Sequence, residues 1–192
     1  MAYHRYQSAG LVLGRLPNGE ANYLYRILTP ELGLIRVLGQ GVRLEKSKMR
    51  FHLPLYSLTN FGLVKGREYW RLAGAQEAEV VNRAQRRLFS RLSLIVLRLL
   101  GEGEPNIKLF NDFAQAYLIL ADKTQISEEE LTMLETFLLV RLLFNLGYLA
   151  NSDLVKDVIK AEDFSWLEIL SFISNKRALI QLINQSLLVS GL

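Results

Sequence analysis

The side chains of this sequence that are best suited to chemistry are cations rather than catalytic groups. The eight residues from 43 to 50 hold four cations and one acid: Arg43, Lys46, Lys48 and Arg50 against Glu45. Lys and Arg side chains neutralise phosphates, and a cluster of them gives an electrostatic surface for nucleic acid. The alternative is a solvated surface loop. We predict nucleic acid contacts at this stretch.

Further cations and aromatic residues surround this stretch in the first 75 residues. Aromatic rings that accompany a positive surface provide platforms on which the bases of a single strand stack. The same tyrosines could instead be half-buried strand residues with no ligand. The predicted contacts here are Arg15, Arg36, Tyr23 and Tyr25, and the other members of the group include Arg26, Arg67, Arg71, Tyr69 and Trp70.

A third group of cations lies on a predicted helix that ends near residue 100. At 100° per residue its arginines fall within an arc of about 140°, and residues 80–100 contain no acid. A basic amphipathic helix is also typical of a membrane surface or a peptide-groove partner, or it is simply a solvated face. We predict that Arg83 and Arg87 extend the positive surface of the first 75 residues.

The residue types that most enzymes use are scarce. The chain has no Cys, which removes disulfides, thiol catalysis and cysteine-ligated zinc, and its two histidines are His4 and His52. Glu128, Glu129 and Glu130 fall in the first turn of a predicted helix, where carboxylates are favoured without any ligand. The sequence therefore predicts a protein that is not an enzyme and that has no cofactor and no metal.

Charge is distributed unevenly along the chain. Residues 1–100 hold 16 Lys/Arg against 6 Asp/Glu, whereas residues 101–192 hold 7 against 13. Such asymmetry suggests contact with nucleic acid or with a membrane surface. The longest apolar stretch, 137–149, is interrupted by Arg141 and Asn145 and is too short to span a bilayer. We therefore expect a cytoplasmic protein without a membrane partner.

The periodicity of apolar residues indicates strands first and helices afterwards. Alternation and turn residues predict five short strands over 8–16, 21–27, 34–39, 53–64 and 68–75, as in a small barrel, with the OB-fold as the leading candidate. A period of 3.6 then predicts helices over 77–100, 106–122, 127–146, 152–160, 165–174 and 176–190. The expected fold is a two-domain α+β protein, with an OB-fold barrel over 1–76 and a helical bundle over 77–192.

The N-terminal stretch resembles the RecO family of bacterial DNA repair proteins. The resemblance rests on four short segments in order, 9–13, 18–22, 28–35 and 39–43, followed by Lys46-Ser47-Lys48 and Leu53-Pro54-Leu55. Leu146-Gly147-Tyr148 resembles the helical domain of that family. The similarity is strong over residues 5–75 and weak afterwards.

The resemblance implies a function and a set of partners. It implies binding of single- and double-stranded DNA, annealing of complementary strands, and help in loading the recombinase RecA in the RecF pathway. It also implies a RecR-like protein and the single-stranded-DNA-binding protein as partners, and a location at the bacterial nucleoid. We hypothesise that the acidic tail of the single-stranded-DNA-binding protein contacts three cations late in the chain, Arg141, Lys176 and Arg177.

Some residues depart from the family pattern. Asn22 stands where the family usually has Asp, and Tyr23 stands where Arg is common. Many members carry a four-cysteine zinc site, which this chain lacks, and they are longer, so we expect a short, zinc-free member. A second hypothesis, from another class, is a helical adaptor or scaffold with only weak electrostatic contact to nucleic acid.

Overall fold

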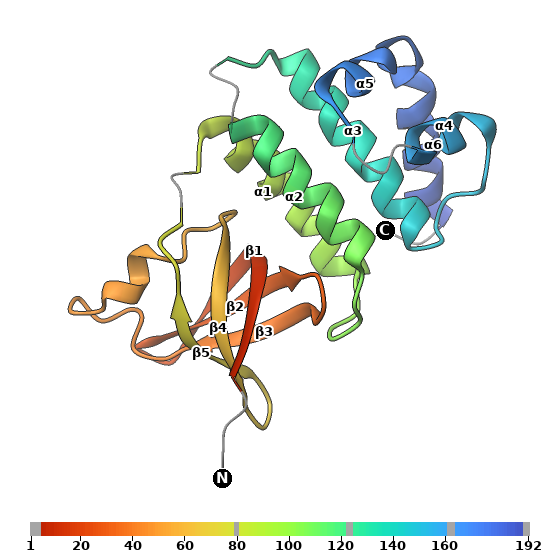
Figure 1. The fold of residues 1–192 in the computed structure, drawn as a ribbon. Coiled ribbons are helices and arrows are strands. Elements are labelled where there is room, and N and C mark those ends of the chain that lie inside the picture. Colours follow the sequence, from red (N-terminus) through yellow and green to blue (C-terminus); the bar gives the residue numbers. More distant parts are fainter. Residues whose placement is uncertain (1–4, 79–80, 122–124, 161–163, 190–192) are drawn as a thin grey trace. The chain divides into compact units, whose positions relative to one another are not determined.

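The computed structural model describes the chain except for residues 1–4, 79–80, 122–124, 161–163 and 190–192. The chain forms two compact units, residues 1–110 and residues 111–192 (Figure 1). The strands lie in the first unit, and the second unit is helical. The predicted division into domains 1–76 and 77–192 stays a prediction.

Five strands of the first unit close into a barrel. They are β1 (Arg5–Asn18), β2 (Asn22–Thr29), β3 (Gly33–Gly39), β4 (Leu58–Lys65) and β5 (Trp70–Ala75), in the order β1-β2-β3-β5-β4 (Figure 1). All neighbours are antiparallel except β3 and β5, which run parallel. The long β1 closes the barrel because it pairs with both β2 and β4. The predicted OB-fold is confirmed.

Alternation along the strands places the core inside the barrel. In β2, Tyr25 and Ile27 point inward and are almost fully buried, as are Val37 of β3 and Phe61 and Leu63 of β4. Each of these side chains is separated from the next inward one by a residue on the outer face, as the pleat of a strand requires. The outward positions of β2 and β3 are therefore available to carry function.

The predicted strand over 53–64 begins later than expected. Residues 53–57 form an irregular segment before β4, and Tyr56 adopts a left-handed backbone with φ of 67°. The segment still pairs with β1, because Tyr56 N donates to Val12 O at 2.7 Å and Val12 N donates to Ser57 O at 3.0 Å. Pro54, which has no N–H to donate, explains why the apolar run does not extend the sheet backward.

Helix α1 (Arg83–Leu99) completes the first unit. It begins at residue 83 and not at 77, because Asn82 caps it in a reciprocal capping box with Gln85. Its buried face includes Leu88, Leu92 and Val96, whereas Leu94 is 72% exposed. Ile95 and Leu99, which lie beside this face, are only half-buried. The helix packs against β1.

The helices after α1 follow the predicted pattern closely. They are α2 (Ile107–Ala121), α3 (Glu128–Asn145), α4 (Asp153–Lys160), α5 (Trp166–Ser171), the 3-10 turn η2 (Ile173–Asn175) and α6 (Lys176–Val189). Ser127 and Glu130 form a capping box at the start of α3, and Gly147, with φ of 79°, follows its end. Helix α3 is buried nearly all round and packs against α4, α5 and α6. The predicted helix over 165–174 is divided at Phe172.

Within the described part of the chain, no helix combines the length and the apolar character that crossing a membrane requires.

Candidate nucleic-acid interface

Two predicted arginines lie against the ring of Tyr23 at one end of the barrel. The guanidinium carbon of Arg15, near the end of β1, is 4.7 Å from the centroid of the Tyr23 ring. That of Arg43, in the loop between β3 and β4, is 5.4 Å from the same centroid. Cation–π attraction holds such pairs together. The fold thus joins three predicted contact residues, separated by up to 28 positions, into one cluster, which we call the Tyr23 cluster.

Backbone contacts fix the position of Arg43. Its Nη1 donates to Gly19 O at 2.7 Å, and its backbone N donates to Ala21 O at 3.0 Å. Beside it, Asn22 Oδ1 accepts from Gly41 N at 2.8 Å, so the β1–β2 turn is tied to the loop after β3. Gly41 has φ of 68°, a conformation that glycine adopts without strain. An amide oxygen accepts this hydrogen bond as a carboxylate oxygen would, so the contact does not require the Asp that the family usually has here.

The remaining cations of the 43–50 stretch lie on an exposed loop. Lys46 and Lys48 are exposed, and the loop ends in the short 3-10 turn η1 (Lys48–Phe51). The backbone of Arg50 lies in this turn, but its side chain is outside the described residues. Leu44 is 55% exposed and Phe51 is 66% exposed, so two apolar side chains stand among the cations. Sequence reasoning missed both, although apolar residues within a polar loop are a visible signal.

Tyr25 does not lie on this surface. It is 1% exposed and belongs to the barrel core, where its ring meets that of Tyr23 edge-on at 5.9 Å between centroids. A Cβ on Gly39 would come within 2.8 Å of the Tyr25 ring. Burial raises the pKa of the Tyr25 hydroxyl, and the nearby charge of Arg15 partly offsets the rise. Because its ring is buried, Tyr25 cannot make the predicted base contact, and it packs against Tyr23 instead.

The outer face of β2 and β3 carries a second group of cations. Arg26 and Arg36 lie opposite each other in the two strands, and Arg36 is 5.0 Å from the Tyr69 ring centroid. Arg71 follows on β5, beside Leu38. In OB-folds this face and the adjoining loops bind oligonucleotides. Arg26 and Arg36 both form ion pairs with Glu102. The sequence did not indicate Glu102, because it lies at least 66 positions from either arginine.

The arginines of α1 are less informative. Arg83, the first residue of the helix, is exposed, whereas Arg87 is half-buried. Their predicted contribution to the positive surface stays a prediction.

Arg141, the first of the three cations assigned to a protein partner, is used inside the helical unit. It is 7% exposed; its Nη2 donates to Asp112 Oδ1 at 2.7 Å and its Nη1 donates to Val158 O at 2.9 Å. Its guanidinium also lies over the rings of Phe137 and Phe164. An arginine in these surroundings holds helices together and cannot accept an acidic tail. The other two cations, Lys176 and Arg177, begin α6, and their predicted partner contact stays a prediction.

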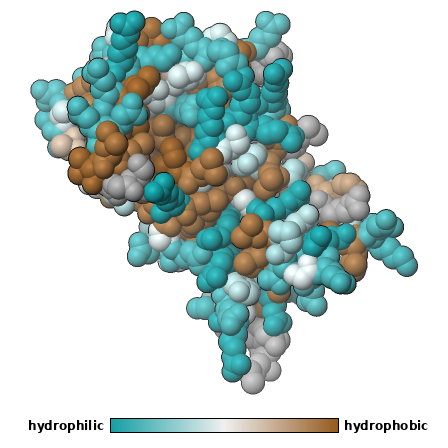
Figure 2. All heavy atoms as spheres, turned by 180° about the vertical axis from the view of Figure 1, so that it is seen from behind, coloured by the Kyte–Doolittle hydropathy of each residue, from teal (hydrophilic) through white to brown (hydrophobic). Residues whose placement is uncertain are grey.

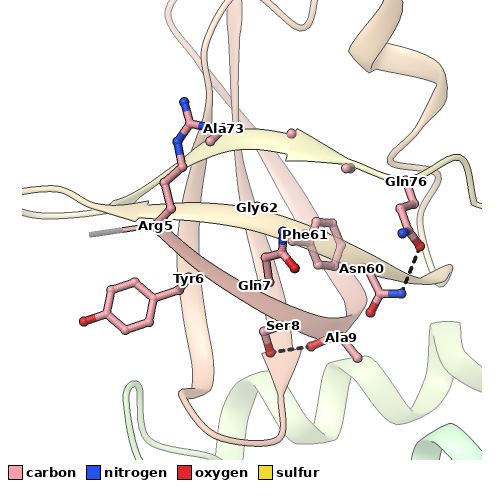
Figure 3. Close-up of a pocket in the computed structure, with 12 residues that line it drawn as sticks. Arg5, Tyr6, Gln7, Ser8, Ala9, Asn60, Phe61, Gly62, Ala73 and Gln76 are labelled. Carbon is pink, nitrogen blue, oxygen red and sulfur yellow. Dashed lines mark hydrogen bonds between the residues drawn. The ribbon is translucent and has the colours of Figure 1, made fainter. Parts of the chain in front are cut away.

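The first unit also contains a pocket that was not predicted. It measures about 560 Å³ and lies over β1, β4 and β5 (Figure 3). Its floor contains Gly62 and Gly74, and the amides of Asn60 and Gln76 are hydrogen-bonded to each other at 3.0 Å. Arg5 is the one cation among its lining residues, whereas Tyr6 points away (Figure 3). This lining suits a neutral ligand better than a polyanion.

The described residues thus define a class: a closed OB-fold barrel with cations and aromatic rings at one end and on its β2–β3 face. Among the described residues no group of three His, Asp or Glu side chains could hold a metal ion.

Comparison with known proteins confirms the resemblance to the RecO family, although no family model matches the chain. The chain is 34% identical to DNA repair protein RecO of Gloeothece citriformis over 110 residues, which are 55% of this chain and 39% of the relative. It is 32% identical to DNA repair protein RecO of Acaryochloris marina over 124 residues, 62% of this chain and 42% of the relative. It is 28% identical to DNA repair protein RecO of Rubrobacter xylanophilus over 153 residues, which are 77% of this chain and 60% of the relative. The chain therefore spans less than two thirds of the length of these relatives.

Proposed function

We propose that this chain is a DNA repair protein that binds single- and double-stranded DNA through its barrel and anneals complementary strands. The names of its relatives support a role in DNA repair. The observation that carries the binding proposal is the Tyr23 cluster, in which Arg15 and Arg43 flank one aromatic ring beside an exposed loop of cations. Guanidinium groups that track phosphates and a ring that stacks on a base together bind a single strand without sequence preference.

Annealing follows from charge neutralisation. Two complementary strands repel each other through their phosphates, and a protein that neutralises these charges lets base pairing begin. No covalent bond forms or breaks in this process, so the proposal assigns no catalytic residue and no cofactor. We further propose that the protein acts at the bacterial nucleoid and assists recombinase loading with a RecR-like protein and the single-stranded-DNA-binding protein.

The binding proposal is tested by titrating a fluorescent single-stranded oligonucleotide with the whole chain over a series of salt concentrations. Contact with about four phosphates predicts a log–log slope of roughly −3. Replacing Arg43, Lys46 and Lys48 together with Glu should abolish binding at moderate salt. Lys46 and Lys48 are exposed, and surface substitutions of this kind usually change stability by less than about 0.5 kcal/mol. Arg43 also loses its hydrogen bond to Gly19 O, so circular dichroism checks that the variant is folded.

A matched control reverses three cations elsewhere in the chain. Lys108, Lys176 and Arg177 changed to Glu give the same change in net charge, and none of them lies in the barrel. We expect the control to keep most of the affinity. A flat salt dependence of the unmodified chain, or equal losses in the two triple variants, would contradict binding through the loop.

Annealing is tested separately with two complementary oligonucleotides that carry a fluorescence donor and acceptor. The chain should accelerate duplex formation, and the loop triple variant should not. Repeating the measurement with strands coated by a single-stranded-DNA-binding protein tests the mediator role. If the chain accelerates duplex formation on bare strands but not on coated strands, it anneals DNA but does not act as a mediator.

A helical adaptor is the second candidate, and one observation favours it. The helical unit exposes large apolar residues, among them Leu167 at 80%, Leu188 at 76% and Val189 at 91%, and Figure 2 shows hydrophobic side chains at its surface. Exposed apolar residues that gather on a surface are typical of protein contacts. A chain that binds partner proteins but gives no salt-dependent oligonucleotide binding would support this candidate over the first.

A further inference from the structure

Two arginines face each other across strands on the outer face of the barrel, and one carboxylate joins them. Arg26 of β2 and Arg36 of β3 are direct partners in the antiparallel register. Like charges placed directly opposite each other destabilise a sheet unless an anion compensates them. Here Glu102 supplies that anion: Arg26 Nη1 is 2.5 Å from its Oε1 and Arg36 Nε is 2.7 Å from its Oε2. The two carboxylate oxygens are thus divided between the two arginines.

The backbone around Glu102 brings it to this face. Glu102 follows α1 and forms an isolated parallel bridge with Leu34 of β3, and Gly103 N donates to Leu34 O at 2.9 Å. Gly33, with φ of 66°, faces the carbonyl of Glu104 so closely that a Cβ on it would clash with that oxygen. The segment after α1 therefore lies along the start of β3, and the Glu102 side chain reaches the arginines from there.

The ion pairs that Glu102 makes are open to solvent. The side chains of Arg26 and Arg36 are 29% and 39% exposed, and that of Glu102 is 38% exposed. Ion pairs at such a surface are weak and screened, so another anion can replace one partner. A phosphodiester also presents two anionic oxygens, and arginine binds phosphate and carboxylate groups with the same fork of donors. The Tyr69 ring beside Arg36 adds an aromatic surface at the same place.

We propose that Arg26 and Arg36 form a phosphate-binding site on the β2–β3 face, and that Glu102 occupies this site until a nucleic acid phosphate displaces it. This inference rests on the proposed function and goes beyond it, since it adds Arg26 to the contact residues and assigns Glu102 a competing role. Glu102 then lowers the affinity for nucleic acid, and ligands with several closely spaced phosphates bind in preference to single anions.

The test compares two variants that change net charge equally. Glu102→Gln removes the competing charge, whereas Glu104→Gln changes a carboxylate two residues away that makes no ion pair with a described residue. Glu102→Gln should tighten binding of a single-stranded oligonucleotide about threefold or more relative to Glu104→Gln at low salt. Because phosphate displaces Glu102 in the bound state, both variants make the same phosphate contacts, and their log–log salt slopes should be similar.

A second comparison removes the arginines. In a chain with Arg26→Gln and Arg36→Gln, the further change Glu102→Gln should leave affinity and slope unaltered, because the site no longer exists. An unaltered affinity for Glu102→Gln in the otherwise unmodified chain would instead mean that the pairs are purely structural, and would overturn the inference. Absence of salt-dependent binding in every variant, Glu102→Gln included, would contradict the proposed function itself.

The unmodified chain offers a measurement that needs no substitution. The Arg36 Nε–H group, which donates to Glu102, gives a distinct NMR resonance in a chain labelled with ¹⁵N-arginine. Adding the oligonucleotide should shift this resonance as phosphate replaces carboxylate, and raising salt should reverse the shift. If the loop cations bind the oligonucleotide while the Arg36 resonance stays unmoved, the site is not used, and the inference fails while the proposed function stands.

Discussion

Arginines have opposite surroundings in the two compact units of this chain. In the barrel unit, Arg15 and Arg43 lie beside the ring of Tyr23 with their charge open to solvent. In the helical unit, Arg141 is buried and ion-paired with Asp112. A guanidinium that keeps its water can exchange it for a phosphate, whereas one whose donors are already used inside a core cannot. Burial, more than residue type, decides which cations can bind a ligand.

The net charge of each unit agrees with this difference. Residues 1–110 hold 17 Lys/Arg against 8 Asp/Glu, and residues 111–192 hold 6 against 11. A positive unit attracts polyanions from a distance, whereas a negative one repels them. The assignment of DNA to the barrel unit and of protein contacts to the helical unit is thus consistent with both long-range charge and local geometry. Substitutions in each unit can test the contrast.

The largest effect is expected from Arg141→Ala. Removing one partner of a buried pair leaves Asp112 charged in the core, which typically costs about 3–5 kcal/mol in the free energy of unfolding. Each unit contains one tryptophan, Trp70 or Trp166. Urea denaturation followed by Trp166 fluorescence, in a Trp70→Phe background, therefore reports on the helical unit. Oligonucleotide binding by the barrel should be unaffected in native conditions.

Arg177→Ala is the matched control for this substitution. Arg177 is exposed near the start of α6, and its loss should change the free energy of unfolding by less than about 0.5 kcal/mol. Equal effects of the two substitutions would contradict the structural role of Arg141. A large loss of oligonucleotide affinity in Arg141→Ala, with the fold intact, would break the contrast between the units.

Most of the fold could be predicted from the sequence because the signals are local. Alternation of apolar and polar residues predicted the strands, and a period of 3.6 predicted the helices. The errors have local causes as well. The segment before β4 is irregular because Tyr56 takes a left-handed backbone and Pro54 cannot donate. Helix α1 begins after its Asn82 cap and not at residue 77, where the apolar periodicity changes.

The candidate site was less predictable because its contacts are distant in sequence. The charge pattern indicated the loop and Arg15, but no local rule links Glu102 to Arg26. Tyr23 and Tyr25 both suggested stacking, yet they share the inward face of β2, and only Tyr23 lies near the end of the barrel. Similarly, the apolar surroundings of Arg141 were visible in the sequence, whereas its pairing with Asp112 was not.

A smaller effect, on affinity rather than stability, is expected from Tyr23→Ala. Losing one aromatic platform costs about 1–3 kcal/mol per stacked base, or roughly tenfold in affinity for a single strand. The slope of affinity against salt should stay unchanged, because the substitution removes no cation. Phe at the same position should restore binding. A changed slope with unchanged low-salt affinity would show that Tyr23 only positions Arg15 and Arg43.

The smallest effect concerns the buried hydroxyl beneath that cluster. Because burial raises the pKa of Tyr25 above its ordinary value of 10.0, the folded chain retains this proton at a pH where the unfolded chain releases it. Its contribution to stability is therefore fully present below pH 10 and is lost progressively as the pH rises above 10.

Urea denaturation followed by Trp70 fluorescence, in a Trp166→Phe background, should show this loss, and Tyr25→Phe should reduce it. Tyr148→Phe, in the helical unit, is the control and should leave the pH dependence of the barrel unchanged. If stability declines equally with pH in the Tyr25→Phe chain, other groups cause the decline. The buried Tyr25 hydroxyl would then have no part in the contrast between the barrel core and the exposed Tyr23 cluster.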